Sequence, residues 1–252
     1  MDIFSERIDI PAATISIDSY IFYPKNKISQ PTLLPAIILF TDIRGPRSVY
    51  DELASRLAAQ GYYVVMPHIY YRAGTAPVID PTIPVAEEPT FTKRRELAAT
   101  LTTKAQEQDF SYIIDWLEHN PHVIPHHYGV VGYCMTGPFA LRLAALYPEH
   151  IVAAAGFHGA NYVTGEADSV DHLVKKIKGA VYLGHAKEDA LNPQSAIDQL
   201  GKALAEGQIN YQNIIYDAGH GYTMPDSPAF DQKASEKAFK NLVQFFDHYL
   251  KV

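Results

Sequence analysis

The sequence of 252 residues predicts an α/β protein with a mainly parallel central sheet that carries helices on both faces. Two observations lead to this prediction. Short apolar runs typical of strands alternate along the chain with longer segments of helical periodicity. Some of these runs, such as residues 36–40, are apolar at every position, which indicates strands buried on both faces. The alternation implies βαβ units with right-handed crossovers.

The expected strands are short segments rich in apolar, β-branched and aromatic residues. They cover residues 15–23, 36–40, 62–66, 128–133, 151–157, 180–183 and 209–216. The expected helices show apolar residues three or four positions apart, most clearly near the C-terminus. They cover residues 48–60, 91–117, 135–147, 169–178, 193–206 and 230–250. Two of the helices have a glycine stop signal, at Gly61 and Gly207.

The chain shows no internal repeat, linker or shift in composition, so we expect a single domain over residues 1–252. Residues 73–90 contain four prolines and no periodicity. Irregular segments of this length inside a compact domain are usually functional or mobile. We therefore expect an excursion or a lid at about residues 73–90.

Composition excludes several classes of protein. With 47% apolar and 19% charged residues the chain is too hydrophobic for a disordered protein. A formal net charge of −7 argues against nucleic acid as a partner. The single cysteine rules out an intrachain disulfide, and neither a signal peptide nor a membrane span is visible. We expect a soluble cytoplasmic protein, a monomer or small homo-oligomer, with no membrane partner.

The strongest local signal is the GYCMTG segment at residues 132–137, between an expected strand and an expected helix. A nucleophile at such a turn lies in a strained conformation above the carboxyl edge of the sheet, and Gly132 relieves the crowding there. The amide of Met135 points to where an oxyanion would form, and the helix N-terminus stabilises a thiolate. Cys134 is therefore the predicted nucleophile. The alternative is an inert buried thiol.

A nucleophile needs a base and a group that orients the base. On a sheet of this kind the chain order is nucleophile, acid, histidine. Asp189 follows the strand expected at 180–183, and His220 lies on a glycine-flanked loop after the strand expected at 209–216. Each reactive residue thus follows a different strand. The sequence predicts a catalytic triad of Cys134, Asp189 and His220.

These segments resemble the dienelactone hydrolase family of α/β-hydrolases, and the likeness runs along most of the chain. The matching segments are the elbow at 132–134, the acid loop KED at 187–189, the histidine loop AGHG at 218–221 and PHIYYR at 67–72. The resemblance implies an α/β-hydrolase fold, no cofactor, and cleavage of small-molecule esters or lactones through a thioester. It also implies that Arg72 holds a substrate carboxylate.

The sequence departs from the family pattern at three places. Asp42 stands in the loop where founding members carry a glutamate that contacts the resting thiol. Thr136 stands where a glycine is common, and residues 222–225 (YTMP) lack a second substrate-binding arginine. A lone arginine makes a weaker clamp for a substrate carboxylate, which argues against dienelactone itself as the substrate and leaves the hydrolytic machinery intact.

Further site residues are expected around the triad. The amide of Ile43 is the second oxyanion donor beside Met135, and the substrate-binding candidates are Asp42, Arg72, Tyr133 and His158. Each of three candidates also has a structural alternative. Asp42 could cap its loop or be solvated, Arg72 could form an ion pair, and His158 could bond a carbonyl.

Other functions are weighed against the hydrolase. Four histidines within residues 119–127 straddle two prolines without a recognisable zinc spacing, so no metal site is expected. No GxGxxG follows residues 36–40, which argues against a dinucleotide-binding protein. An acyltransferase or a peptidase with the same triad, and a non-catalytic small-molecule-binding module that keeps the fold, remain open.

Overall fold

The computed structural model describes residues 2–25, 33–84 and 86–251. The chain forms two compact units, Met1–Pro125 and His126–Val252. The sequence predicts that both belong to one domain, and this stays a prediction. In the described part of the chain, none of the helices combines the length and apolarity that crossing a membrane requires.

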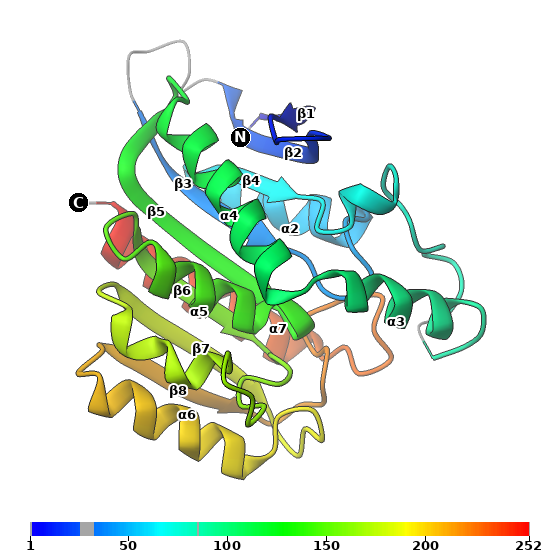
Figure 1. Ribbon diagram of the computed structural model, residues 1–252, viewed down its shortest axis with the longest axis vertical. Helices are drawn as coiled ribbons and strands as arrows, with labels where there is room; N and C mark the ends of the chain where they lie inside the picture. The colour runs from blue at the N-terminus through cyan, green and yellow to red at the C-terminus, as the bar shows by residue number, and fades with distance from the viewer. Residues whose placement is uncertain (1, 26–32, 85, 252) are drawn as a thin grey trace. The chain divides into compact units, whose positions relative to one another are not determined.

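In its described residues, the first unit contains the strands β1-β2-β4-β3, named in their order across the sheet (Figure 1). Their bounds are Ile3–Ile10 for β1, Ile17–Pro24 for β2, Leu34–Phe40 for β3 and Tyr63–Pro67 for β4. β1 pairs with β2 and β2 with β4 in antiparallel fashion, whereas β3 and β4 are parallel. The helices described in this unit are α2 (Ser48–Ala59), α3 (Thr90–Thr100), α4 (Thr103–Glu118) and the 3₁₀ turn η1 (Tyr71–Ala73). In Figure 1, α4 lies in front of the strands and α2 behind them.

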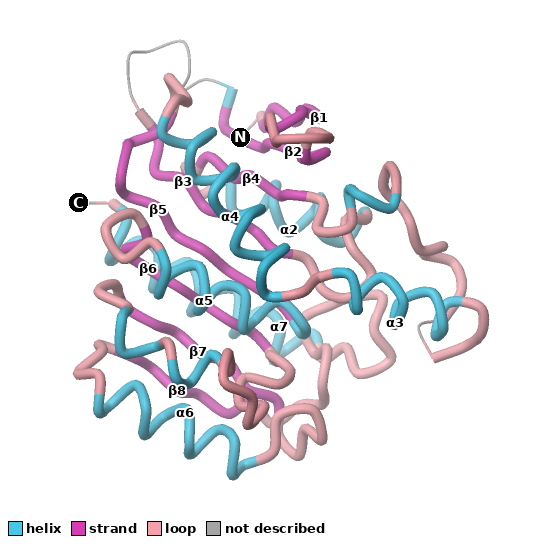
Figure 2. The backbone as a smooth tube through the Cα atoms, in the orientation of Figure 1, coloured by secondary structure: helices cyan, strands magenta, loops and turns pink. Residues whose placement is uncertain are grey.

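The second unit contains the parallel strands β5-β6-β7-β8 (Figure 2). Their bounds are Val123–Tyr133 for β5, which enters from the first unit, Ile151–Phe157 for β6, Ala180–Ala186 for β7 and Tyr211–Tyr216 for β8. The helices are α5 (Gly137–Leu146), α6 (Gln194–Glu206) and α7 (Gln232–Leu250), with the 3₁₀ turn η2 (Cys134–Thr136) before α5. α5 and α6 lie in front of these strands and α7 behind them. Parallel strands with helices on both faces confirm the predicted α/β class.

Two expected helices differ from the prediction. The segment expected at 91–117 is two helices, because α3 ends at Thr100 and the extended Thr102 then caps α4 by accepting a hydrogen bond from the amide of Ala105. The helix expected at 169–178 is wrong. That stretch forms two 3₁₀ turns, η3 (Val170–His172) and η4 (Val174–Lys176), since the buried Asp171 is held by Ser169 and by Gln199 of α6.

The proline-rich segment contains no helix or strand between residues 74 and 89, counted over its described residues. One hydrogen bond attaches this segment to the loop after β3 in the first unit. The buried Arg44 donates from Nη2 to the carbonyl of Pro81 at 2.7 Å. The lid at residues 73–90 stays a prediction, and Arg44 is one of the residues that would hold it in place.

Candidate functional site

Each strand of the second unit is followed, within a few residues, by one of the predicted site residues. Cys134 follows β5, His158 follows β6, Asp189 follows β7 and His220 follows β8. Because the strands are parallel, their carboxyl ends lie along one edge of this sheet. This is the edge at which open α/β sheets assemble their binding sites.

Cys134 occupies a sharp turn between β5 and the helical segment that leads into α5. Its φ of +54° lies in the left-handed region, which is strained for a residue with a side chain. A Cβ atom at Gly132 would come within 2.0 Å of the carbonyl oxygen of Thr136, so the turn can close only over a glycine. The elbow therefore has the local geometry that the sequence pattern predicts.

Thr136, which stands where the family pattern commonly has a glycine, stabilises this turn. Its buried hydroxyl accepts a hydrogen bond from the amide of Tyr133 at 2.9 Å and donates one to the Tyr133 carbonyl at 3.0 Å. The amide of Ala160, beyond β6, donates to the carbonyl of Cys134 at 3.0 Å. The turn is thus held both by its own hydroxyl and by the neighbouring strand's loop.

The structure brings Cys134, His220 and Asp189 into one chain of hydrogen bonds. Nε2 of His220 lies 3.1 Å from Sγ of Cys134, and Nδ1 lies 2.6 Å from Oδ2 of Asp189. The Asp189 side chain is 2% exposed and that of His220 25% exposed. Such a chain joins a nucleophile to a base and the base to a group that orients it.

The electrostatics of this chain favour a protonated imidazole. Burial alone would lower the pKa of His220, but the hydrogen bonds and charges of Asp189 and Cys134 outweigh it and raise the pKa to about 10. His220 therefore keeps its proton through neutral pH when a thiolate lies beside it.

The loop that carries Asp189 is supported by residues that no pattern in the sequence singles out. Oδ1 of Asp189 accepts from the amide of Leu191 at 2.9 Å. The side chain of Asn192, in the same loop, donates to Nδ1 of the buried His185, and Nε2 of His185 in turn bonds Asn213 on β8. Burial lowers the pKa of His185, so it acts as a neutral spacer between the loop and the sheet. No spacing in the sequence signals this arrangement.

His158 lies inside the second unit and shares a hydrogen bond of 2.7 Å with Thr223. It is 1% exposed, and its ring lies edge-on to the ring of His220 with centroids 5.4 Å apart. Burial, with the charge of His220, holds the pKa of His158 well below its ordinary value. The observed partner of the ring is thus a hydroxyl and not a carbonyl, and the role of His158 as a substrate contact stays a prediction.

Tyr133 is buried, with 2% of its surface exposed. Its ring stacks on Phe157 with centroids 5.6 Å apart and tilts against His158 at 5.9 Å. Within the second unit the ring therefore packs against the end of β6 and the residue that follows it. Its role as a substrate contact stays a prediction.

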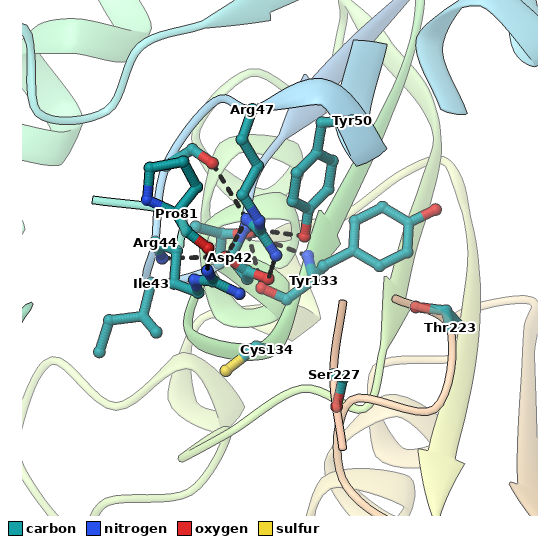
Figure 3. Close-up of polar contacts among 12 residues, drawn as sticks. Asp42, Ile43, Arg44, Arg47, Tyr50, Pro81, Tyr133, Cys134, Thr223 and Ser227 are labelled. Carbon is teal, nitrogen blue, oxygen red and sulfur yellow. Dashed lines mark hydrogen bonds and ion pairs between the residues drawn. The ribbon is translucent and has the colours of Figure 1, made fainter. Parts of the chain in front are cut away.

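In the first unit, Asp42 lies in a network of hydrogen bonds at the end of β3 (Figure 3). Arg47 binds both carboxylate oxygens, at 2.8 and 2.7 Å, and the amide of Arg44 donates to Oδ1 at 2.9 Å. The hydroxyl of Tyr50 accepts from the amide of Asp42. The carboxylate thus caps its own loop, and its role as a substrate contact stays a prediction. The carbonyl of Ile43 accepts from Tyr70, and the role of the Ile43 amide stays a prediction.

Arg72 forms a two-pronged ion pair with Asp109 of α4. Nη1 and Nη2 lie 2.9 and 2.6 Å from the two carboxylate oxygens. The guanidinium also lies over the ring of Tyr71, at 4.4 Å from its centroid, and Tyr71 donates its hydroxyl proton to Asp109. The ion-pair alternative is what the first unit shows for Arg72, and substrate contact stays a prediction.

Comparison with known proteins agrees with the likeness found in the sequence. The family model of the dienelactone hydrolase family matches residues 17–250. Carboxymethylenebutenolidase from Rhodococcus opacus is 30% identical over 227 residues, which cover 86% of this chain and 82% of that protein. The hydrolase pyvD of Aspergillus violaceofuscus is 27% identical over 93% of this chain and 88% of its own length.

Among solved structures, a dienelactone hydrolase-like promiscuous phosphotriesterase from metagenomic libraries matches with a TM-score of 0.79. The match covers 98% of each chain at 18% identity, so it shows a common fold. The relatives and the family model together support a hydrolase of the lactone or ester type. This chain belongs to the dienelactone hydrolase family.

Proposed function

We propose that the protein is a cysteine-dependent hydrolase of carboxylic esters or lactones that works through a thioester acyl-enzyme. The observation that carries the proposal is the hydrogen-bond chain from Cys134 Sγ through His220 to Asp189. In this proposal Cys134 is the nucleophile, His220 the proton carrier and Asp189 the residue that orients the imidazole.

In the first half-reaction the thiolate of Cys134 attacks the carbonyl carbon, and the electron pair of the C=O bond moves to oxygen. The amide of Met135, in the first turn after the elbow, is the proposed donor to this oxyanion. Collapse of the intermediate breaks the C–O bond of the ester, and the imidazolium of His220 protonates the leaving alkoxide. For a lactone the leaving alcohol stays attached to the acyl group.

In the second half-reaction the now neutral His220 takes a proton from water as the hydroxide attacks the thioester. The C–S bond breaks, the carboxylic acid leaves, and the thiolate–imidazolium pair is restored. Asp189 keeps Nδ1 of His220 protonated throughout, so Nε2 is the nitrogen that exchanges the proton with thiol, alcohol and water.

The substrates we propose are small esters and lactones, since relatives are named carboxymethylenebutenolidase. The ion pair between Arg72 and Asp109 occupies the arginine that the resemblance assigns to a substrate carboxylate. The proposal therefore does not require an acidic substrate.

A cytoplasmic location is also proposed, because the mechanism needs the single cysteine as a thiol.

The experiment that tests the proposal is acid-quenched mixing with p-nitrophenyl acetate, followed by intact-mass and peptide analysis. We expect a burst of p-nitrophenol equal to the enzyme concentration and an acetyl group on Cys134. Added alcohols and amines separate hydrolysis from acyl transfer, because a transferase would give ester or amide products. Steady release of p-nitrophenol with an unmodified Cys134 would contradict the thioester mechanism.

The high pKa of His220 leads to a prediction on thiol reactivity. We expect iodoacetamide to alkylate wild-type Cys134 at pH 6 at least about 10-fold faster than it alkylates the His220→Ala variant, because an ordinary thiol is almost wholly protonated there. Wild type is expected to react faster than the variant because the pKa of His220 is raised, so the imidazolium that stabilises the thiolate persists until the pH approaches about 10.

The measurement is the alkylation rate from pH 5 to 10, and it reports on one residue because the chain has a single cysteine. The variant should become reactive only as the pH nears the ordinary thiol range. Equal profiles for both proteins would show that His220 does not stabilise a thiolate.

A further inference from the structure

His158 is a buried histidine that the proposed reaction does not use, although it lies at the same edge of the second unit's sheet. Its ring touches three aromatic neighbours at centroid distances of 5.4 to 5.9 Å: His220, Tyr222 and Tyr133. Its Nε2 shares a hydrogen bond of 2.7 Å with the hydroxyl of Thr223. His158 therefore contacts both His220 and the loop that carries it.

We propose that His158 is a positioning residue for the catalytic imidazole, which it acts on by packing against the His220 ring and by holding the His220 loop through Thr223. The inference rests on the proposed function, because it assigns His158 a role in placing the base of that triad. The chemistry itself remains with Cys134, His220 and Asp189.

The backbone around His158 is built to hold the ring in place. Its φ of +36° lies in the left-handed region, which is strained for a residue with a side chain. Its amide donates to the carbonyl of Gly184 on β7 at 2.7 Å. A fixed backbone and complete burial leave the imidazole little freedom, so it can serve as a rigid support.

The loop after β8 needs such support because it carries His220 between two glycines. The carbonyl of Thr223 accepts from the hydroxyl of Ser235 on α7 at 3.2 Å, and the carbonyl of Tyr222 accepts from the amide of Asp231 at 3.1 Å. These bonds tie the loop to the helix side of the unit. The bond from Thr223 to His158 ties it to the end of β6, on the side of the His220 ring.

The role requires a neutral His158. The titratable groups that face its ring are His220 and Tyr222 from the loop after β8 and Tyr133 from the end of β5. None of these groups supplies a negative charge. The His220 imidazolium would repel a protonated His158, because the two ring centroids lie 5.4 Å apart. Burial and His220 together hold the pKa of His158 well below its ordinary value, so the ring stays neutral wherever His220 is charged.

The test compares Thr223→Val with Thr223→Ser. Valine keeps the shape of threonine and removes the hydroxyl, whereas serine keeps the hydroxyl. We expect kcat for p-nitrophenyl acetate to fall about 10-fold in Thr223→Val with little change in KM, because a small displacement of a reacting group has effects of this size or larger. The alkylation rate of Cys134 at pH 6 should also fall several-fold, and Thr223→Ser should restore most of both quantities.

Further variants separate the positioning role of His158 from a general loss of packing. His158→Gln retains a polar amide that can bond Thr223 and has no titratable group, so it should keep more activity than His158→Leu. Combining His158→Leu with Thr223→Val should lower kcat little more than His158→Leu alone, because both substitutions remove the same bond.

Tyr182→Phe is the matched control, since it removes a buried hydrogen bond of 2.8 Å between the hydroxyls of Tyr182 and Tyr216 without touching His220. It should lower stability and leave the pH profile unchanged.

The inference and the proposed function fail in different ways. Unchanged kcat and alkylation profiles in Thr223→Val, with Cys134 still essential, would overturn the positioning role alone. Loss of activity in Thr223→Val and Thr223→Ser alike, with matching loss of thermal stability, would also overturn it. Hydrolysis that does not need Cys134 would instead overturn the proposed function.

Discussion

Replacing Cys134 by alanine will abolish ester and lactone hydrolysis while the second unit still folds. Without Sγ no acyl-enzyme can form, and what remains is whatever the oxyanion donors and substrate binding supply on their own. In enzymes with a comparable triad, loss of the nucleophile costs about 10⁴-fold or more in kcat. The strained turn accepts alanine as it accepts cysteine, because both carry a Cβ and the crowding arises at Gly132.

The measurement is the hydrolysis of p-nitrophenyl acetate and a small unsaturated lactone by wild type and variant side by side. Circular dichroism and thermal unfolding provide the control for the fold. Cys134→Ser is the chemical control, since it keeps a nucleophilic atom at nearly the same position but lacks the acidity of a thiol, and it should retain a small fraction of activity. A fully active alanine variant would rule out Cys134 as the nucleophile.

Replacing Asp189 by asparagine will lower kcat by about 10³- to 10⁴-fold with a much smaller effect on KM. The side chain has nearly the same shape, and its oxygen can still accept from the amide of Leu191. Its amide nitrogen, however, is a donor facing Nδ1 of His220, so the imidazole is forced to carry its proton on Nε2. A base with the wrong nitrogen protonated cannot take a proton there, and the equivalent change in serine proteases has an effect of about 10⁴-fold.

The same substitution removes one of the groups that raise the pKa of His220. Alkylation of Cys134 should therefore shift toward the alkaline behaviour of an ordinary thiol, together with the fall in kcat. Glu188→Gln is the matched control, because it removes a charge from the neighbouring, exposed position. If Asp189→Asn kept wild-type kcat and an unchanged alkylation profile, the orienting role of Asp189 would be refuted.

Much of the fold could be predicted because buried positions are occupied by apolar residues, whose spacing along the sequence differs between strands and helices. β3 is buried at all seven positions, and α7 shows the apolar spacing of a helix with one packed face. β1 is not among the predicted strands, because its pattern is mixed, with exposed charged side chains on an outer strand. The apolar side chains of residues 169–178 recur at nearly helical spacing and so predict a helix, whereas a side-chain network around Asp171 holds this stretch in 3₁₀ turns.

The candidate site was predictable to the extent that it depends on strand ends. Cys134, Asp189 and His220 could be picked out because each residue follows a strand, and parallel strands gather their ends. The support of these residues could not be read in this way. The bonds from His158 to Thr223 and from Asp42 to Arg47 depend on loop conformation and side-chain rotamers, which leave no periodic trace.

The register of β6, β7 and β8 has a consequence for how folding of the second unit can be followed. A slip by one residue would move a strand end by about 3.3 Å and turn its side chains to the other face. The contact of 2.6 Å between Asp189 and His220 would not survive such a slip, and Cys134 would then react as an ordinary thiol. The alkylation rate of the single cysteine at mildly acid pH can therefore be used to follow refolding. We expect this rate to rise only when these strands have reached their native register.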